Sequence, residues 1–162
     1  MDVVARRDLT LIPLTLLLAL IVDQIALPAG LSGLRPPLML LLVLFWCLIT
    51  PHWVGVSVAW LVGLVSDVLS GGLLGANAMA FSMAGYLMLM LHQQVRVLPL
   101  MQQSLFVLMI LVCARLLLLL TLLATGKSVA PEVLYPALIG ALVWAPVVLM
   151  VQRWRINSEL SR

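Results

Sequence analysis

The chain has 162 residues, of which 64% are apolar and only 9% are charged. Soluble domains carry about 25% charged residues, so this composition excludes an ordinary soluble fold and indicates a protein of the lipid bilayer. The net charge of +3 comes mostly from residues at the chain ends and in short gaps between apolar runs, which indicates a membrane topology signal and argues against nucleic-acid binding.

Six apolar runs predict an all-α integral membrane protein, a six-helix transmembrane bundle in a single domain covering residues 1–162. The expected spans are residues 9–27, 36–50, 53–70, 76–91, 100–124 and 133–151. Helices are expected because lipid offers backbone amides no hydrogen-bond partner, and because the alternating polarity of a membrane barrel is missing. No small-residue cleavage site follows the first run, which is therefore interpreted as an uncleaved span.

Some spans are short for a bilayer. The second has about 15 residues, or roughly 22 Å of helix, against a hydrocarbon core of about 30 Å. Either the membrane thins locally or some helices do not cross it completely. A re-entrant hairpin in place of spans two and three is an alternative that preserves an even number of crossings.

The basic residues predict that both termini are cytoplasmic. With six spans and a cytoplasmic N-terminus, six basic residues lie inside and two lie outside, in agreement with the positive-inside rule. The inside set is Arg6, Arg7, Arg96, Arg153, Arg155 and Arg162, and the outside set is Arg35 and Lys127.

Small residues recur at intervals of four in three spans. They are Gly55, Ala59 and Gly63 in the third, Ala76, Ala80 and Ala84 in the fourth, and Ala137, Ala141 and Ala145 in the sixth. Residues at this spacing share one helix face and allow backbones to approach closely. These spans are expected to pack against one another or against a partner's helix, whereas spans two and five suit lipid-facing surfaces or broad grooves for other helices.

Four charged residues are expected to converge in the outer half of the bundle: Asp23, Arg35, Asp67 and Arg115. Because an ion in lipid costs several kcal/mol, such groups normally pair, face the bundle interior or find water. We expect Asp67 to pair with Arg115 or Arg35 as a structural anchor. A proton or substrate site, or a contact between Arg115 and a partner protein, is the alternative.

Catalytic and metal-binding patterns are missing from the sequence. It contains no HExxH, GxSxG, CxxC or phosphate-loop motif. His52 and His92 are expected at the face opposite Asp23 and Asp67, so no catalytic triad or metal cluster is expected to form. The sequence predicts neither an enzyme nor a cofactor, and the two cysteines are interpreted as small hydrophobic residues.

The segment SDVLSGGLLGAN, residues 66–77, interrupts the apolar pattern. Gly71, Gly72 and Gly75 permit a tight reversal of the chain, while Ser66 or Ser70 can satisfy freed backbone groups. The segment therefore predicts the outer turn of a helix hairpin.

The longer segment GLVSDVLSGGLLGANAMAFSMAGYL, residues 63–87, resembles the central signature of MreD, a family of bacterial rod shape-determining membrane proteins. Three further landmarks support the resemblance: Arg35 and Pro36 at the second span, Pro51 and His52 after it, and Pro131 and Glu132 before the last span. The residues singled out for structural or interaction roles are Asp67, Ser70, Gly71, Gly75, Gly63, Arg35, Pro36, Arg115 and Ala80.

The resemblance implies a noncatalytic scaffold of the cell-wall elongation machinery in the bacterial inner membrane. Its expected partners are MreC, the RodA glycosyltransferase, penicillin-binding protein 2, indirectly the actin-like MreB, membrane lipid and, in a homodimer, a second copy. We expect Gly63 and Ala80 to lie in a groove that binds the transmembrane helix of MreC. The implied fold is similar to that of the substrate-binding subunits of energy-coupling-factor vitamin transporters, and such a subunit is the alternative function. That alternative requires a polar, aromatic-lined pocket on the outer side.

Overall fold

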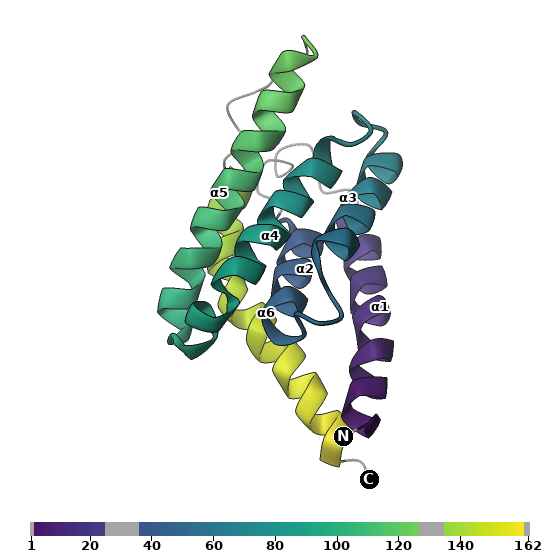
Figure 1. The fold of residues 1–162 in the computed structure, drawn as a ribbon, viewed down its shortest axis with the longest axis vertical. Coiled ribbons are helices and arrows are strands. Elements are labelled where there is room, and N and C mark those ends of the chain that lie inside the picture. Colours follow the sequence, from purple (N-terminus) through teal and green to yellow (C-terminus); the bar gives the residue numbers. More distant parts are fainter. Residues whose placement is uncertain (1, 25–35, 127–134, 161–162) are drawn as a thin grey trace.

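The structure is a computed structural model that describes residues 2–24, 36–126 and 135–160, with side chains described for residues 11–23, 36–126, 135–151 and 153. The described residues form six helices and no strand (Figure 1). The helices are α1 (Asp2–Gln24), α2 (Leu38–Ile49), α3 (Val56–Ser70), α4 (Ala76–Val97), α5 (Leu100–Ala124) and α6 (Tyr135–Leu160). The expected all-α architecture with six helices is confirmed.

Helix α5 is the one helix in the described ranges that is long and apolar enough by itself to cross a membrane. It has 25 residues, or about 37 Å of helix at 1.5 Å per residue. Four shorter apolar segments lie in α1, α2, α3 and α6. The segments in α2 and α3 are whole helices, and their 12 and 15 residues agree with the sequence-based expectation that some spans are short for a bilayer.

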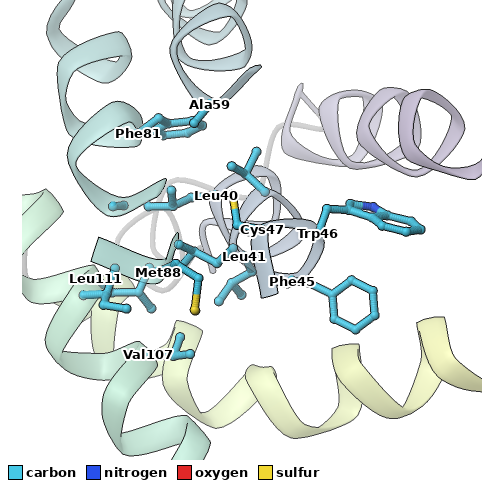
Figure 2. Close-up of a cluster of buried hydrophobic side chains, with 14 of the residues drawn as sticks. Leu40, Leu41, Phe45, Trp46, Cys47, Ala59, Phe81, Met88, Val107 and Leu111 are labelled. Atoms are coloured by element: carbon cyan, nitrogen blue, oxygen red, sulfur yellow. The ribbon is translucent and has the colours of Figure 1, made fainter. Parts of the chain in front are cut away.

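Helix α2 lies at the centre of the bundle and contacts α1, α3, α4 and α6 (Figure 1). Nine of its 12 residues are buried. Figure 2 shows Leu41 of α2 beside Met88 of α4 and Leu111 of α5, while the ring of Phe45 points away from these residues. The second apolar run therefore fills the groove between other helices and does not face lipid, which resolves the two readings left open by its composition.

Helices α2 and α3 are shorter than the hydrocarbon core of an ordinary bilayer. Their 12 and 15 residues give about 18 Å and 22 Å of helix against a hydrocarbon core of about 30 Å. Figure 1 shows that each covers only part of the long axis of the bundle. Consecutive short helices joined by residues 50–55 agree with either incomplete crossing or local membrane thinning, and the crossing itself stays a prediction.

The small residues of α3 and α4 face each other inside the bundle. A Cβ atom added to Gly63 would lie 2.6 Å from the Cα of Ala78, and one added to Gly85 would lie 2.9 Å from the Cβ of Ala59. Ala80 is also buried, at 3% exposure. Gly63 therefore serves the close approach of α3 and α4, which argues against its lying in a groove for MreC, and the contact with MreC stays a prediction.

Helix α1 is linked to the central helix by a buried polar contact. The indole Nε1–H of Trp46 donates to Thr15 Oγ1 at 2.9 Å, and the Thr15 hydroxyl is also within 2.8 Å of the carbonyl oxygen of Leu11. Sequence reasoning did not single out either residue. A threonine inside an apolar first span was the available signal, since a buried hydroxyl needs a partner.

The beginning of α1 and the end of α6 lie at the same end of the bundle (Figure 1). We call this the terminal end, and we call the opposite end, where α1 and α3 finish and α2, α4 and α6 begin, the hairpin end. An even number of passes along the bundle axis produces this arrangement.

Candidate functional site

The turn between α3 and α4 requires glycine at two positions. Gly71, which follows α3, has φ 61°, and Gly75, which precedes α4, has φ 96°. Both values lie in the left-handed region, where a residue with a Cβ atom is strained. These two glycines reverse the chain within five residues and bring the end of α3 against the start of α4.

Asp67 joins the two helices through its carboxylate. Its Oδ2 accepts hydrogen bonds from the backbone N–H of Gly75 at 2.8 Å and of Ala78 at 3.2 Å, and its Oδ1 accepts from that of Asn77 at 3.0 Å. The side chain is only 2% exposed.

The first amides of a helix have no intrahelical acceptor, and the helix dipole favours a negative charge beside them. Asp67 lies in the last turn of α3 and therefore acts as an N-terminal cap for α4. That role is normally filled by a side chain at the start of the capped helix itself. The backbone carbonyl of Asp67 in turn accepts a hydrogen bond from Ser70 Oγ at 3.2 Å. The polar residues of this turn thus hold one another and fix the α3–α4 hairpin.

The expected ion pair between Asp67 and Arg115 is not formed between these two described residues. Both carboxylate oxygens of Asp67 are instead occupied by backbone amides. Three charge-assisted hydrogen bonds therefore satisfy the buried carboxylate. The other expected partner, Arg35, lies outside the described residues.

Asp23 makes a similar carboxylate–backbone contact between α1 and α2. Its Oδ2 accepts a hydrogen bond from the backbone N–H of Met39 at 3.1 Å. Asp23 is the penultimate residue of α1, and Met39 is the second residue of α2. A carboxylate near the end of one helix therefore contacts the start of the next helix at both places.

A polar cavity of about 490 Å³ lies at the hairpin end. Its polar lining residues come from four helices and are Asp23, Ser66, Ser70, Asn77 and Arg115. Pro36, Ala80 and Phe81 contribute to its apolar wall. We refer to this space as the hairpin cavity.

Arg115 reaches the hairpin cavity from within α5, the one described helix that is long and apolar enough to cross a membrane. It lies nine residues before the end of α5 at Ala124, or about 14 Å along the helix, and is the only charged residue of that helix. Its charge interacts electrostatically with that of Asp23, which lines the same cavity. The convergence expected for the charged residues is therefore found for Asp23 and Arg115.

The two histidines lie away from this cavity. His52 follows α2 and is exposed, while His92 lies in the last turns of α4, and both of those helices begin at the hairpin end. Across the described part of the chain, no three or more His, Cys, Asp or Glu side chains are grouped as metal ligands would be.

A family model described as rod shape-determining protein MreD matches residues 6–154 of the chain. The chain belongs to the MreD family. The rod shape-determining protein MreD of Haemophilus influenzae is 27% identical to it over 144 residues, which cover 88% of this chain and 89% of that relative. No solved structure matches, so the similarity to substrate-binding subunits of energy-coupling-factor transporters stays a prediction.

Membership of the MreD family supports a general function. This MreD protein takes part in the determination of rod shape, in association with the shape-determining machinery, and its family is membrane-associated. The matched residues include every described residue that lines the hairpin cavity and the residues of both carboxylate contacts. These features therefore lie within the part of the chain that is similar to MreD.

Proposed function

We propose that this MreD protein is a noncatalytic scaffold of the cell-wall elongation machinery, spanning the inner membrane several times with both termini in the cytoplasm. It binds the transmembrane helix of MreC and so helps to position RodA and penicillin-binding protein 2. Membership of the MreD family supports a role in rod shape determination. The short connections between α2, α3, α4 and α5 support an action within the membrane, because they leave little mass outside it.

An apolar groove between α1 and α6, with α2 at its base, is the observation that carries the proposed contact with MreC. It is lined by Thr15, Leu18, Ala19, Val22, Leu38, Leu42, Val147, Met150 and Val151 and has a volume of about 210 Å³. We call it the α1–α6 groove. Thr15, the one polar residue among the described residues of its lining, already has hydrogen-bond partners within the bundle.

Shape decides whether an apolar helix docks here. Lipid tails are as apolar as leucine, so helices associate in a membrane through close van der Waals packing and not through a hydrophobic driving force. A groove between two helices provides such packing for the side chains of a third. The proposal therefore moves the MreC contact from the α3–α4 face, which is buried, to the α1–α6 groove.

Cysteine crosslinking tests this contact with two matched pairs of positions. Leu18→Cys and Met150→Cys place a thiol in the groove. Leu17→Cys and Leu149→Cys place a thiol on the preceding residue of each helix, which is exposed and outside the groove lining. Each is combined with a replacement of the exposed Cys113. With single cysteines along the MreC helix, we expect the groove positions to give at least five times the crosslink yield of their neighbours.

Equal yields from the groove and neighbouring positions would contradict docking in the α1–α6 groove. Equally strong crosslinking from an additional cysteine at Met109, an exposed position on α5, would place MreC on another face. The family assignment and the scaffold role would survive that outcome, and only the contact would be overturned.

The hairpin cavity favours one second candidate, a substrate-binding subunit of a vitamin transporter. It supplies the polar pocket that such a subunit requires, although Phe81 is its one aromatic lining residue in the described part of the chain. Neighbouring genes discriminate the two functions. Genes for MreB and MreC support the scaffold, and genes for energy-coupling ATPases support transport.

A further inference from the structure

We propose that the hairpin cavity binds the phosphate of a phospholipid headgroup, with Arg115 as the principal contact. This inference is independent of the docking of MreC, because no described residue lines both the cavity and the α1–α6 groove. It assigns to this cavity a lipid ligand held between α1, α3, α4 and α5.

The position of Arg115 is the first argument. A cation within a transmembrane helix costs several kcal/mol unless it meets water, a counter-charge or a polar ligand. Among the described residues, the guanidinium of Arg115 has no hydrogen bond or ion-pair contact, and its electrostatic interaction is with Asp23 across the cavity. Its five N–H donors form a planar fork that matches two oxygens of a phosphate.

The other polar side chains of the cavity suit the same ligand. Ser66, Ser70 and Asn77 place two hydroxyls and an amide on the wall formed by α3 and α4. The hydroxyl of Ser66 and the side-chain amide of Asn77 can each donate a hydrogen bond to a phosphate oxygen, whereas the hydroxyl of Ser70 already donates to the carbonyl oxygen of Asp67. The backbone N–H of Asn77 is already bonded to Asp67, so only the side chain of Asn77 is available to the ligand.

Size and access agree with a headgroup. Ligand pockets commonly have volumes of about 300–1,000 Å³, and the hairpin cavity has about 490 Å³. Leu69 and Ser70 line the cavity and are exposed, Leu69 at 45%. The cavity is therefore accessible from the surface of α3, and its leucine and proline side chains offer an apolar surface to the glycerol and first methylene groups of a lipid.

The balance of charge indicates the kind of phosphate. Among the described residues that line the cavity, Asp23 supplies the one carboxylate and Arg115 the one guanidinium. A phosphate monoester carries a charge of about −1.5 to −2 at neutral pH, whereas the phosphodiester of a phospholipid carries a single negative charge. The phosphodiester therefore suits this cavity better than a free or terminal phosphate.

Native mass spectrometry of the full chain tests the inference. The protein is extracted from nanodiscs of phosphatidylethanolamine and phosphatidylglycerol, and the phospholipid retained after delipidation is quantified. We expect Arg115→Gln to retain at least five times less phospholipid than the wild-type protein. The matched control Arg96→Gln removes an exposed arginine in the last turn of α4, outside the cavity, and should retain the wild-type amount. A competition arm with millimolar inorganic phosphate should leave the retained lipid unchanged.

A second variant keeps the inference testable if Arg115→Gln does not fold. Ser66→Leu fills the cavity from α3 without changing its charge and should also reduce retention at least five-fold. Wild-type retention by a folded Arg115→Gln or Ser66→Leu variant would overturn the inference. Displacement of the lipid by inorganic phosphate would overturn the phosphodiester assignment. If Arg115→Gln abolished recovery of MreC while the lipid stayed bound, Arg115 would belong to a protein contact and the inference would be wrong.

Discussion

Replacing Asp67 with alanine is expected to lower the free energy of unfolding by about 3 kcal/mol or more. The substitution removes the acceptor of three backbone N–H groups at the start of α4. A buried donor left without a partner costs about 1–3 kcal/mol, and the loss of an ordinary capping side chain costs about 0.5–2 kcal/mol. Asp67→Asn should fall between the wild-type protein and Asp67→Ala, because it keeps one acceptor oxygen and loses the charge.

The midpoint of thermal unfolding in detergent, monitored by size-exclusion chromatography, measures this loss of stability. Ser70→Ala is the matched control in the same turn, since Ser70 is exposed and donates one hydrogen bond, to the carbonyl of Asp67. The midpoint should fall strongly for Asp67→Ala and only slightly for Ser70→Ala. Exchanging Asp67 and Arg115 should not restore stability. Rescue by that exchange would show that an ion pair and not the backbone contact holds this hairpin. Equal midpoints for Asp67→Ala and Ser70→Ala would contradict the stabilising role of the Asp67 carboxylate.

Enlarging Gly63 is expected to separate α3 from α4. A Cβ atom there would lie 2.6 Å from Ala78 Cα and 2.8 Å from the carbonyl oxygen of Asn77. Both are backbone atoms, which cannot rotate away as a side chain would. Overpacking of a close-packed interior costs about 1–3 kcal/mol for small additions, so Gly63→Ala should destabilise by that amount. Gly63→Leu should prevent recovery of monodisperse protein.

Gly55→Ala provides the control at the residue that precedes the same helix. No atom lies within 4 Å of a Cβ atom added there, and Gly55 has φ −105°, which alanine adopts without strain. Its unfolding midpoint should match that of the wild-type protein. If Gly63→Ala were as stable as Gly55→Ala yet failed to recover MreC, the α3–α4 face would be a partner surface after all.

The helices were predictable because lipid restricts the backbone to helices and apolar runs mark them directly. The expected span 100–124 has the same bounds as α5. The placement of α2 was not predictable from composition, since a run of Leu, Val and Met suits a buried helix and a lipid-facing helix equally. The bundle decides that question, because four other helices contact α2.

The candidate site was predictable in its residues but not in its contacts. Topology alone placed Asp23, Asp67 and Arg115 near one end of the bundle. The partner of Asp67 escaped prediction because backbone amides have no residue signature, and because each residue of a helix points about 100° away from the preceding one. Sequence spacing therefore could not decide whether Asp67 faces the cavity with Arg115 or faces the start of α4.

The central claim is that the scaffold acts by holding MreC in the α1–α6 groove. Rescue of cell shape tests this claim most directly. Leu18→Trp enlarges a side chain in the groove lining, whereas Leu17→Trp makes the same change on the adjacent, exposed residue. In cells that lack their own MreD protein, we expect Leu17→Trp to restore rods and to recover MreC at the wild-type level. Leu18→Trp, produced in equal amount, should recover at least five times less MreC and leave the cells round. Rods and full recovery of MreC with Leu18→Trp would contradict the account.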